Sequence, residues 1–238
     1  MIDLMLKHLE YHAALGFTKH LVYVHSDYLK VMLEDSKVLA CIQVGSLELV
    51  YWDIFGGYDT PVWEYATQAL MYNHALLMMW GENSRLAFLD VDEYLALPHP
   101  ADISMLYNSC FQPGQLQILR RFDALCSSCT VGTSELSVWQ GTDVYTALSH
   151  YSLLRFDTGG LSLDLGKCIA DADHVHSYFV HDAVLKGNAQ AAMVPQSCAF
   201  LVHLVSMIDA RATPEGFQQD TSWHWVLNRS SEARFSPS

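Results

Sequence analysis

The feature that most constrains the fold is an alternation of strand-like and helix-like segments over the first ninety residues. Residues 20–26, 47–52 and 85–90 are short apolar stretches with the β-branched and aromatic content of strands. Residues 28–42 and 60–80, which separate them, have apolar side chains at helical spacing. Strands joined by connections of this length can pair in parallel, so an α/β fold with a mainly parallel sheet flanked by helices is predicted.

Two helices in this half have clear boundary signals. Asp3 can cap a first helix, and Gly16 can end it. Thr60 can cap a later helix that has Pro61 in its first turn, and Gly81 follows that helix. Trp63, Trp80 and the methionines at positions 71, 78 and 79 are assigned to the core.

The second half has a different pattern. Residues 101–108 predict a short helix, and the strand-like segments after it are separated by turns rich in Gly, Ser and Thr. Those segments are residues 116–122, 151–156, 167–170 and 177–181. This pattern predicts antiparallel or mixed pairing. We expect one domain over residues 1–205 and a C-terminal extension over residues 206–238, partly helical near residues 221–228 or disordered.

Composition limits the classes of partner. Of 238 residues, 51% are hydrophobic and 16% are charged, which is enough apolar material for a sizeable core. The net charge of −13 argues against nucleic acid as a partner. No apolar run reaches the roughly 18 to 20 residues that span a bilayer, so no membrane segment is expected in this chain.

Six cysteines leave the redox state open. Cys126 and Cys129 form a C-x-x-C pair, but a zinc site would need a second pair at similar spacing, and the sequence has none. Unpaired or partly buried thiols are the favoured interpretation. A Cys126–Cys129 disulfide in an oxidising compartment stays open as the alternative.

Three carboxylates follow the third strand-like segment in the sequence RLAFLDVDEYL. Asp90 and Asp92 are two residues apart, so on an extended segment they point the same way, and Glu93 follows directly. Mg²⁺ and Mn²⁺ take oxygen ligands and keep positions open for phosphate oxygens. Since ligands of open α/β sheets bind at the carboxyl ends of strands, the segment predicts an anchor for a metal–diphosphate pair. A solvated strand end with capping carboxylates is the alternative.

Several phrases of the sequence, taken in order, resemble glycosyltransferase family 92 and its close relatives of the GT-A fold. The resemblance covers roughly residues 9–205. It is carried by Tyr11, His12 and Gly16; Gln68, Tyr72 and Asn73; Asp90, Val91, Asp92, Glu93 and Tyr94; Lys167 and His181; and His203.

The resemblance implies a GT-A fold, with a Rossmann-like sheet beside a smaller mixed region. It implies an inverting transfer of a sugar, in the best-known members galactose, from a nucleotide-diphosphate donor to a glycan hydroxyl. It implies Mn²⁺ or Mg²⁺ as cofactor. It also implies a location in the Golgi or another secretory-pathway membrane, with the membrane anchor outside this sequence.

The resemblance also implies roles for individual residues. The metal would be held by Asp90, Asp92 and His181, with Asp92 as the direct ligand and Asp90 on the metal through water or on the donor ribose. His181 could instead contact the diphosphate. The donor would be bound by Asp90, Glu93 and Lys167, unless Lys167 only pairs with an acid. An inverting transfer needs a carboxylate base on the acceptor hydroxyl. The sequence does not choose among the available candidates, which are Asp157, Asp164 and Asp182.

Other polar residues have structural interpretations. Gln68 and Asn73 are five apart, not quite on one helix face, and are interpreted as helix-packing residues rather than substrate contacts. His203 lies in an apolar run and is interpreted as structural.

One departure from the family pattern affects the fold and keeps two other functions open. Family members begin with a strand and loop that hold the nucleotide, whereas this sequence starts within the helix that follows. The expected sheet therefore lacks an inner strand. A glycosyltransferase-like binding domain without turnover is one alternative. A haloacid-dehalogenase-type phosphatase is another, although Tyr94 stands where such enzymes usually have Thr or Val.

Overall fold

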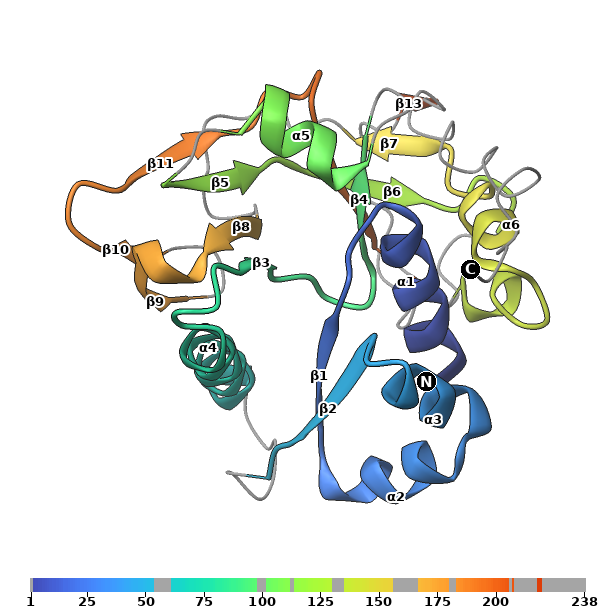
Figure 1. Ribbon diagram of the computed structural model, residues 1–238. Coiled ribbons are helices and arrows are strands. Elements are labelled where there is room, and N and C mark those ends of the chain that lie inside the picture. The colour runs from blue at the N-terminus through green and yellow to red at the C-terminus, as the bar shows by residue number, and fades with distance from the viewer. Residues whose placement is uncertain are drawn as a thin grey trace.

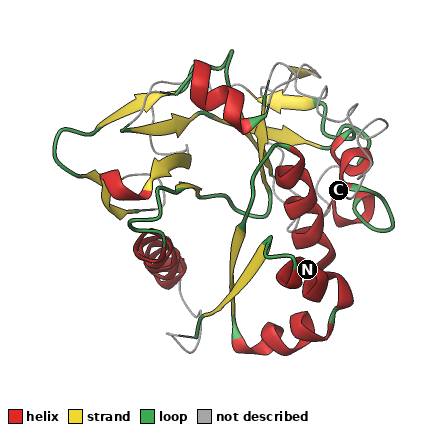
Figure 2. Cartoon of the chain, in the orientation of Figure 1, coloured by secondary structure: helices red, strands yellow, loops and turns green. Residues whose placement is uncertain are grey.

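Helices and strands interleave in a mixed α/β fold in the computed structural model (Figure 2). The structure describes residues 2–53, 61–97, 102–111, 114–129, 135–155, 167–179, 183–205, 207 and 218–219. Within those ranges, no helix combines the length and the hydropathy needed to cross a bilayer.

The N-terminal unit contains two parallel strands and three helices. α1 (Ile2–Ala14) leads to β1 (His20–Val24), which pairs in parallel with β2 (Leu47–Tyr51), as the sequence predicts. The connection between them was predicted as one helix but forms two, α2 (Ser26–Glu34) and α3 (Ser36–Gln43). Asp35 causes the break. Its backbone is extended, and its carboxylate accepts hydrogen bonds from the amides of Lys37 and Val38 at the start of α3.

A second sheet has four strands, and it contains the third strand of the first half. The order is β11 (Gln190–Met193), β5 (Gln115–Leu119), β8 (Lys167–Asp171) and β3 (Arg85–Ala87). β3 pairs antiparallel with β8 and does not join β1. The expectation of one mainly parallel sheet through the first half is therefore met only by β1 and β2. The described fold is mixed α/β with several small sheets, some of them partly parallel.

A third sheet has five strands in the order β13 (Gln218–Gln219), β7 (Leu153–Arg155), β6 (Arg121–Leu125), β12 (Phe200–Leu204) and β4 (Glu93–Ala96). β12 is parallel to β6 and antiparallel to β4, so the mixed pairing predicted for the second half is confirmed. Residues 116–122 were predicted as one strand. They form two, because the chain leaves the second sheet at Arg120 and enters the third as β6.

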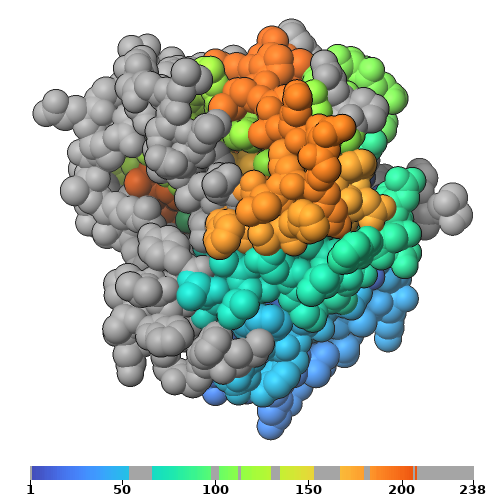
Figure 3. Space-filling view, turned by 90° about the vertical axis from the view of Figure 1, so that its left-hand side faces the viewer, coloured from blue at the N-terminus to red at the C-terminus, as the bar shows by residue number. Residues whose placement is uncertain are grey.

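The remaining elements are short, apart from the long helix α4 (Pro61–Met78). They are α5 (Ile103–Ser109), α6 (Val144–Leu148), the 3-10 turns η1 (Glu135–Val138) and η3 (Ala172–His174), and the hairpin β9 (Val175–Tyr178) and β10 (Ala183–Leu185). In Figure 3, α4 lies between the β9–β11 region above it and the N-terminal unit below it. Asn73 joins α4 to β9, since its amide donates to the Tyr178 carbonyl and accepts from the Tyr178 amide. Its predicted packing role is confirmed.

α1 covers the edge of β4 with polar side chains. The Tyr11 hydroxyl donates to the Leu95 carbonyl at 2.9 Å, and the Leu95 amide donates to Nε2 of His12 at 3.3 Å. The Glu93 carbonyl is 2.9 Å from Nε2 of His8. Burial lowers the pKa of His8 to about 4 and also lowers that of His12, so both rings are neutral at pH 7. The two histidines and the tyrosine therefore fix the strand that starts at Glu93.

Two predicted core side chains lie at the surface instead. Trp80 is 58% exposed and Met78 is 38% exposed, because both follow the last buried turn of α4. The Lys186 ammonium lies 3.8 Å from the centre of the Trp80 ring, a cation–π contact that explains how the indole is accommodated outside the core. Met71 and Met79 are half-buried, and Trp63 lies outside the residues whose side chains are described.

Four of the six cysteines are paired, so the favoured interpretation as unpaired thiols is wrong for them. Cys126 and Cys129 form one disulfide, and Cys110 and Cys198 form another across 88 residues of sequence. Cys41 and Cys168 belong to neither disulfide, and Cys168 is buried. The longer bridge ties the end of α5 to the segment before β12, next to the largest buried cluster.

The two disulfides should contribute unequally to stability. A cross-link that closes a longer loop removes more entropy from the unfolded chain, so the Cys110→Ser/Cys198→Ser variant should lose about 4 to 5 kcal/mol of unfolding free energy. The Cys126→Ser/Cys129→Ser variant should lose about 2 kcal/mol. Equilibrium urea denaturation of the oxidised proteins measures both. Equal losses would contradict the expected difference.

Candidate active site

The acidic segment lies in a turn between the second and third sheets. β3 ends at Ala87, residues 91 and 92 form the turn, and Glu93 begins β4. The Glu93 amide donates to the Asp90 carbonyl, and the Asp90 amide donates to the Glu93 carboxylate, each at 3.0 Å. Because the chain turns here, Asp90 and Asp92 contact different elements. The expectation that both point the same way from an extended segment is wrong.

The Lys167 ammonium is the centre of the site. It lies 3.0 Å from Oδ2 of Asp90 and 3.9 Å from Oε2 of Glu93, and it donates to the Tyr72 hydroxyl at 3.1 Å. Its side chain is only 1% exposed. Burial favours the neutral amine, but the charges of Glu93 and Asp90 outweigh it and hold the pKa of Lys167 above its ordinary value. The three residues predicted to bind the donor thus come together.

α4 supplies two further side chains that hydrogen-bond to Asp90. Gln68 donates through Nε2 to Oδ1 of Asp90 at 2.8 Å and to the Tyr72 hydroxyl at 2.5 Å. The Tyr72 hydroxyl is itself 3.3 Å from the same carboxylate oxygen. Gln68 is thus part of the site rather than only a packing residue, and the role of Tyr72 was missed. The available signal was their spacing of four, which places both on one helix face.

These contacts fix the Asp90 carboxylate without enclosing it. Its side chain remains 42% exposed, although it binds Gln68, Tyr72 and Lys167 on its inner side. Burial raises the pKa of Tyr72, so its hydroxyl keeps its proton. Burial also raises the pKa of Glu93 to about 7, against the opposing effect of Lys167. Asp90 is therefore the carboxylate of this group that a ligand can reach.

His203 forms a second charged group beside Asp92. Its Nε2 lies 3.6 Å from Oδ2 of Asp92, and its Nδ1 lies 2.9 Å from Oδ1 of Asp123. The Arg121 guanidinium is 3.7 Å from the same Asp123 oxygen. Burial opposes the charged imidazole, but the hydrogen bonds to Asp123 and Asp92 raise the pKa of His203 to about 9. The sequence interpretation of His203 as purely structural missed its contact with the acidic segment. A histidine inside an apolar strand needs a polar partner, and that need was the available signal.

The chain's own carboxylates suit a hard divalent cation only in part. Asp90 is oriented and exposed, and the Asp92 side chain is 18% exposed. The described residues place one group of three potential ligand atoms within 4.8 Å of one another, from Cys126, Cys129 and Glu135, and these cysteines form a disulfide. An ion on the aspartates would need further ligands from water or a diphosphate, as Mg²⁺ commonly does. His181, Asp157, Asp164 and Asp182 lie outside the described residues.

A cavity of about 490 Å³ opens beside Asp90. Gln68, Tyr72 and Val91 also line it, together with further residues of α1, β1, α4 and β3. This volume is in the range of small-molecule sites.

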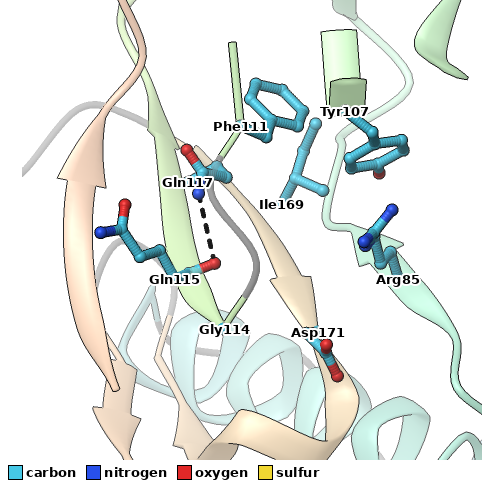
Figure 4. Close-up of a pocket in the computed structure, with 8 residues that line it drawn as sticks. All are labelled: Arg85, Tyr107, Phe111, Gly114, Gln115, Gln117, Ile169 and Asp171. Carbon is cyan, nitrogen blue, oxygen red and sulfur yellow. Dashed lines mark hydrogen bonds between the residues drawn. The ribbon is translucent and has the colours of Figure 1, made fainter. Parts of the chain in front are cut away.

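A separate small cavity lies between α5 and the second sheet (Figure 4). Its volume is about 20 Å³, room for about one water molecule. There the Arg85 guanidinium lies 4.1 Å from the centre of the Tyr107 ring. This cavity has no role in the candidate site.

The comparison with protein families decides the broad class. A family model described as glycosyltransferase family 92 matches residues 2–238. The chain belongs to glycosyltransferase family 92. A search of curated proteins found no match.

Family 92 membership confirms the resemblance drawn from the ordered phrases of the sequence. The structure gives a physical reason for several of those phrases in this member of family 92. Tyr11 and His12 hold β4, Asn73 holds β9, and Gln68 and Tyr72 hold Asp90. Residues far apart in the sequence therefore converge on the segment from Asp90 to Leu95.

Removing the buried ammonium should leave two acidic groups uncompensated. We expect Lys167→Met to lower the unfolding free energy at pH 8 by about 3 kcal/mol. The raised pKa of Glu93 means that this carboxylate destabilises the fold when charged. The loss should therefore shrink as the pH falls to 5 and Glu93 becomes protonated. Urea denaturation at both pH values measures the effect.

A matched pair of variants controls this experiment. Adding Glu93→Gln to Lys167→Met should recover part of the loss at pH 8, and Lys186→Met, which removes a surface ammonium, should cost less than about 1 kcal/mol. A loss for Lys167→Met that does not change between pH 8 and pH 5 would argue against an uncompensated Glu93.

The raised pKa of His203 predicts a loss of stability in alkaline solution. A histidine whose folded-state pKa is about 9 stabilises the fold fully below its ordinary pKa of 6.5 and loses that contribution as the pH rises through 9. We expect a decrease on the order of 3 kcal/mol between pH 6 and pH 10, with EDTA present. His203→Asn should lack most of this decrease. The same pH dependence in both proteins would contradict the assignment.

Proposed function

We propose that this member of glycosyltransferase family 92 transfers a hexose from a nucleotide-diphosphate donor to a glycan hydroxyl, with inversion, and that galactose, the sugar of the best-known members, is the first hexose to test. One observation carries the proposal. Asp90 is held from behind by Gln68, Tyr72 and Lys167, yet its carboxylate is 42% exposed beside a cavity of about 490 Å³. A carboxylate that is already held in position does not have to reorient when charge develops during the reaction.

The residues of the site divide into contacting and positioning groups. Asp92 and Asp90 would hold Mn²⁺ or Mg²⁺, which when bound stabilises the negative charge of the departing diphosphate. Lys167 is enclosed, so we assign it to orienting Asp90 rather than to touching the donor. Glu93 fixes the turn through the Asp90 amide. His203 orients Asp92 from the opposite side.

The disulfides support a proposed location. A chain with a Cys110–Cys198 bridge needs an oxidising compartment to form it. We therefore propose the Golgi or another part of the secretory pathway.

A second candidate function is a glycosyltransferase-like binding domain without turnover. The observation that favours it is that β1 and β3 belong to different sheets, so the described strands form no continuous sheet along the cavity beside Asp90. Such a domain would bind a metal and a sugar nucleotide but would not release the nucleoside diphosphate.

A donor panel tests both candidates. Wild-type protein is incubated with Mn²⁺, a nucleotide sugar such as UDP-galactose and mixed glycan acceptors, and nucleoside diphosphate release is measured. Asp92→Asn should reduce release at least about 100-fold, comparable to the loss of one essential charge-stabilising group. Asp27→Asn, which alters a side chain 79% exposed, is the matched control and should leave it unchanged.

Thermal unfolding gives a second readout. Mn²⁺ should raise the Tm of the wild type but not that of Asp90→Ala/Asp92→Ala. A Tm rise without diphosphate release supports the binding domain. Equal Tm shifts in both proteins would show that the metal binds elsewhere and would overturn the proposed site.

A further inference from the structure

The Cys126–Cys129 disulfide has a carboxylate beside it and lies outside the candidate active site. It follows the end of β6, and Figure 1 shows β6 and β7 side by side with α6 at one end of the pair. Both sulfur atoms and a carboxylate oxygen of Glu135 lie within 4.8 Å of one another. A disulfide has no charge, so it offers this carboxylate no ion pair. The carboxylate is instead in reach of a proton that a cysteine thiol would carry.

Glu135 is enclosed and held next to the sulfur atoms. The residue is only 4% exposed, and its Oε1 accepts a hydrogen bond from the Cys126 amide at 3.3 Å. The Tyr151 hydroxyl also hydrogen-bonds to this carboxylate, and Trp139 donates through Nε1 to the Tyr151 oxygen at 3.1 Å. Burial raises the pKa of Glu135 against these hydrogen bonds, so this carboxylate accepts a proton more readily than an exposed one.

The two sulfur atoms differ in access. Cys126 is 7% exposed, whereas Cys129 is half-buried and follows two exposed serines. A thiolate attacks the disulfide sulfur that it can reach, and the electron pair of the broken bond passes to the other sulfur. Cys129 is therefore the sulfur open to attack. Cys126 is the leaving sulfur, and it lies beside the proton-accepting group.

The turn between the two cysteines has anchors that do not depend on the disulfide. The Ser127 amide and hydroxyl donate to the His150 carbonyl at 2.8 and 3.0 Å. The Ser128 hydroxyl is 2.6 Å from Nδ1 of His150 and 3.5 Å from the Cys126 sulfur. These contacts involve atoms outside the S–S bond, so they hold the turn in place when that bond opens.

Loop length separates this disulfide from the other one. Cys126 and Cys129 are three residues apart, so opening their bridge returns little entropy to the chain. Cys110 and Cys198 close 88 residues beside the largest buried cluster. The longer bridge is suited to holding the fold together, whereas the shorter one can open while the fold persists.

We propose that Cys126–Cys129 is a redox-active disulfide that exchanges two electrons with thiol compounds, with Cys129 as the attacked sulfur and Glu135 as the proton carrier for Cys126. A small dithiol serves as the reductant, and a disulfide such as glutathione disulfide serves as the oxidant. The exchange is a further activity of the chain and does not depend on the proposed sugar transfer.

Reduction by a dithiol proceeds in two steps. One thiolate of the dithiol attacks Sγ of Cys129, the S–S bond breaks, and Cys126 leaves with the electron pair and takes a proton from the Glu135 carboxyl group. The second thiolate of the dithiol then attacks its own sulfur in the mixed disulfide, and Cys129 leaves and is protonated from water. The dithiol becomes a cyclic disulfide, and its two protons pass through water to Glu135 and Cys129. In the reverse direction Glu135 accepts the proton of Cys126.

Selective reduction is the first test. The folded, oxidised protein is treated with dilute dithiothreitol and quenched with N-ethylmaleimide, and peptide mass spectrometry reads each cysteine. We expect Cys126 and Cys129 to become alkylated at least about tenfold faster than Cys110 and Cys198, with the far-UV circular dichroism unchanged. Equal rates for the two disulfides would overturn the proposal.

Single-cysteine variants test which sulfur is attacked. In Cys126→Ser the half-buried Cys129 keeps its thiol, and in Cys129→Ser the enclosed Cys126 does. With glutathione disulfide as the probe, the Cys129 thiol should form its mixed disulfide at least about tenfold faster than the Cys126 thiol. Peptide mass spectrometry reads these positions separately from Cys41 and Cys168. Equal or reversed rates would contradict the assignment of Cys129.

Glu135→Gln tests proton transfer. Its amide oxygen can still accept from the Cys126 amide, but the side chain cannot take a proton. The measured step is the loss of the mixed disulfide at Cys129 as Cys126 closes the ring, with EDTA present. We expect this step to be at least about tenfold slower than in the wild type at pH 6, and equal to it at pH 9, where the thiol ionises unaided. The same slowing at both pH values would show a structural role only and would overturn the proposal.

Two neighbouring titratable groups are controlled separately. His150 reaches the Cys126 sulfur through Ser128, so His150→Asn should keep the wild-type pH dependence of closure. Burial raises the pKa of Tyr151, so its hydroxyl keeps its proton between pH 6 and pH 9. Loss of the pH dependence in His150→Asn would assign the proton to the histidine and overturn the role of Glu135. Sugar transfer is not a readout in any of these experiments, so failure here leaves the proposed function to its own test.

Discussion

The ammonium of Lys167 is the interaction on which the arrangement of the acidic segment depends. A buried charge is costly unless it is paired and hydrogen-bonded. Lys167 meets that requirement with Asp90, Glu93 and Tyr72, which come from the end of β3, the start of β4 and α4. Since β8 belongs to the second sheet and β4 to the third, one ion-pair group joins both sheets and α4 at the candidate site.

The polar side chains of α1 give this arrangement its second support. β4 pairs with β12 on one edge, and on its other side Tyr11 and the neutral rings of His8 and His12 contact its main chain. A polar helix face replaces a neighbouring strand, so the Asp90–Glu93 turn is held from both ends. The candidate site is therefore rigid where charge must be oriented, and open where Asp90 meets the cavity.

Local patterns in the sequence predicted the helices and strands more accurately than they predicted which side chains contact one another. β1, β2 and the start of α4 follow from apolar runs and from Pro61, because these signals act within a few residues. The breaks at Asp35 and Arg120 were missed, since apolar spacing continues through both and only a cap or a change of sheet interrupts the element. The ordered phrases pointed to Asp90, Glu93 and Lys167 as one group. The convergence of Gln68 and His203 on the aspartates depends on how distant elements pack, which spacing along the chain does not encode.

The division of the buried residues into clusters has a consequence for how the molecule comes apart. Met5, Leu9, Val24, Met32, Val38 and Leu47 form a cluster of their own under α2 and α3, distinct from those that support the two larger sheets. Structures built this way open in cooperative units of different stability. β1, β2, α2 and α3 form the smallest such unit, so heat or a protease would reach one wall of the cavity first. The ion-pair corner on the other wall would persist, and the protein would lose the shape of its pocket before it lost its charge arrangement.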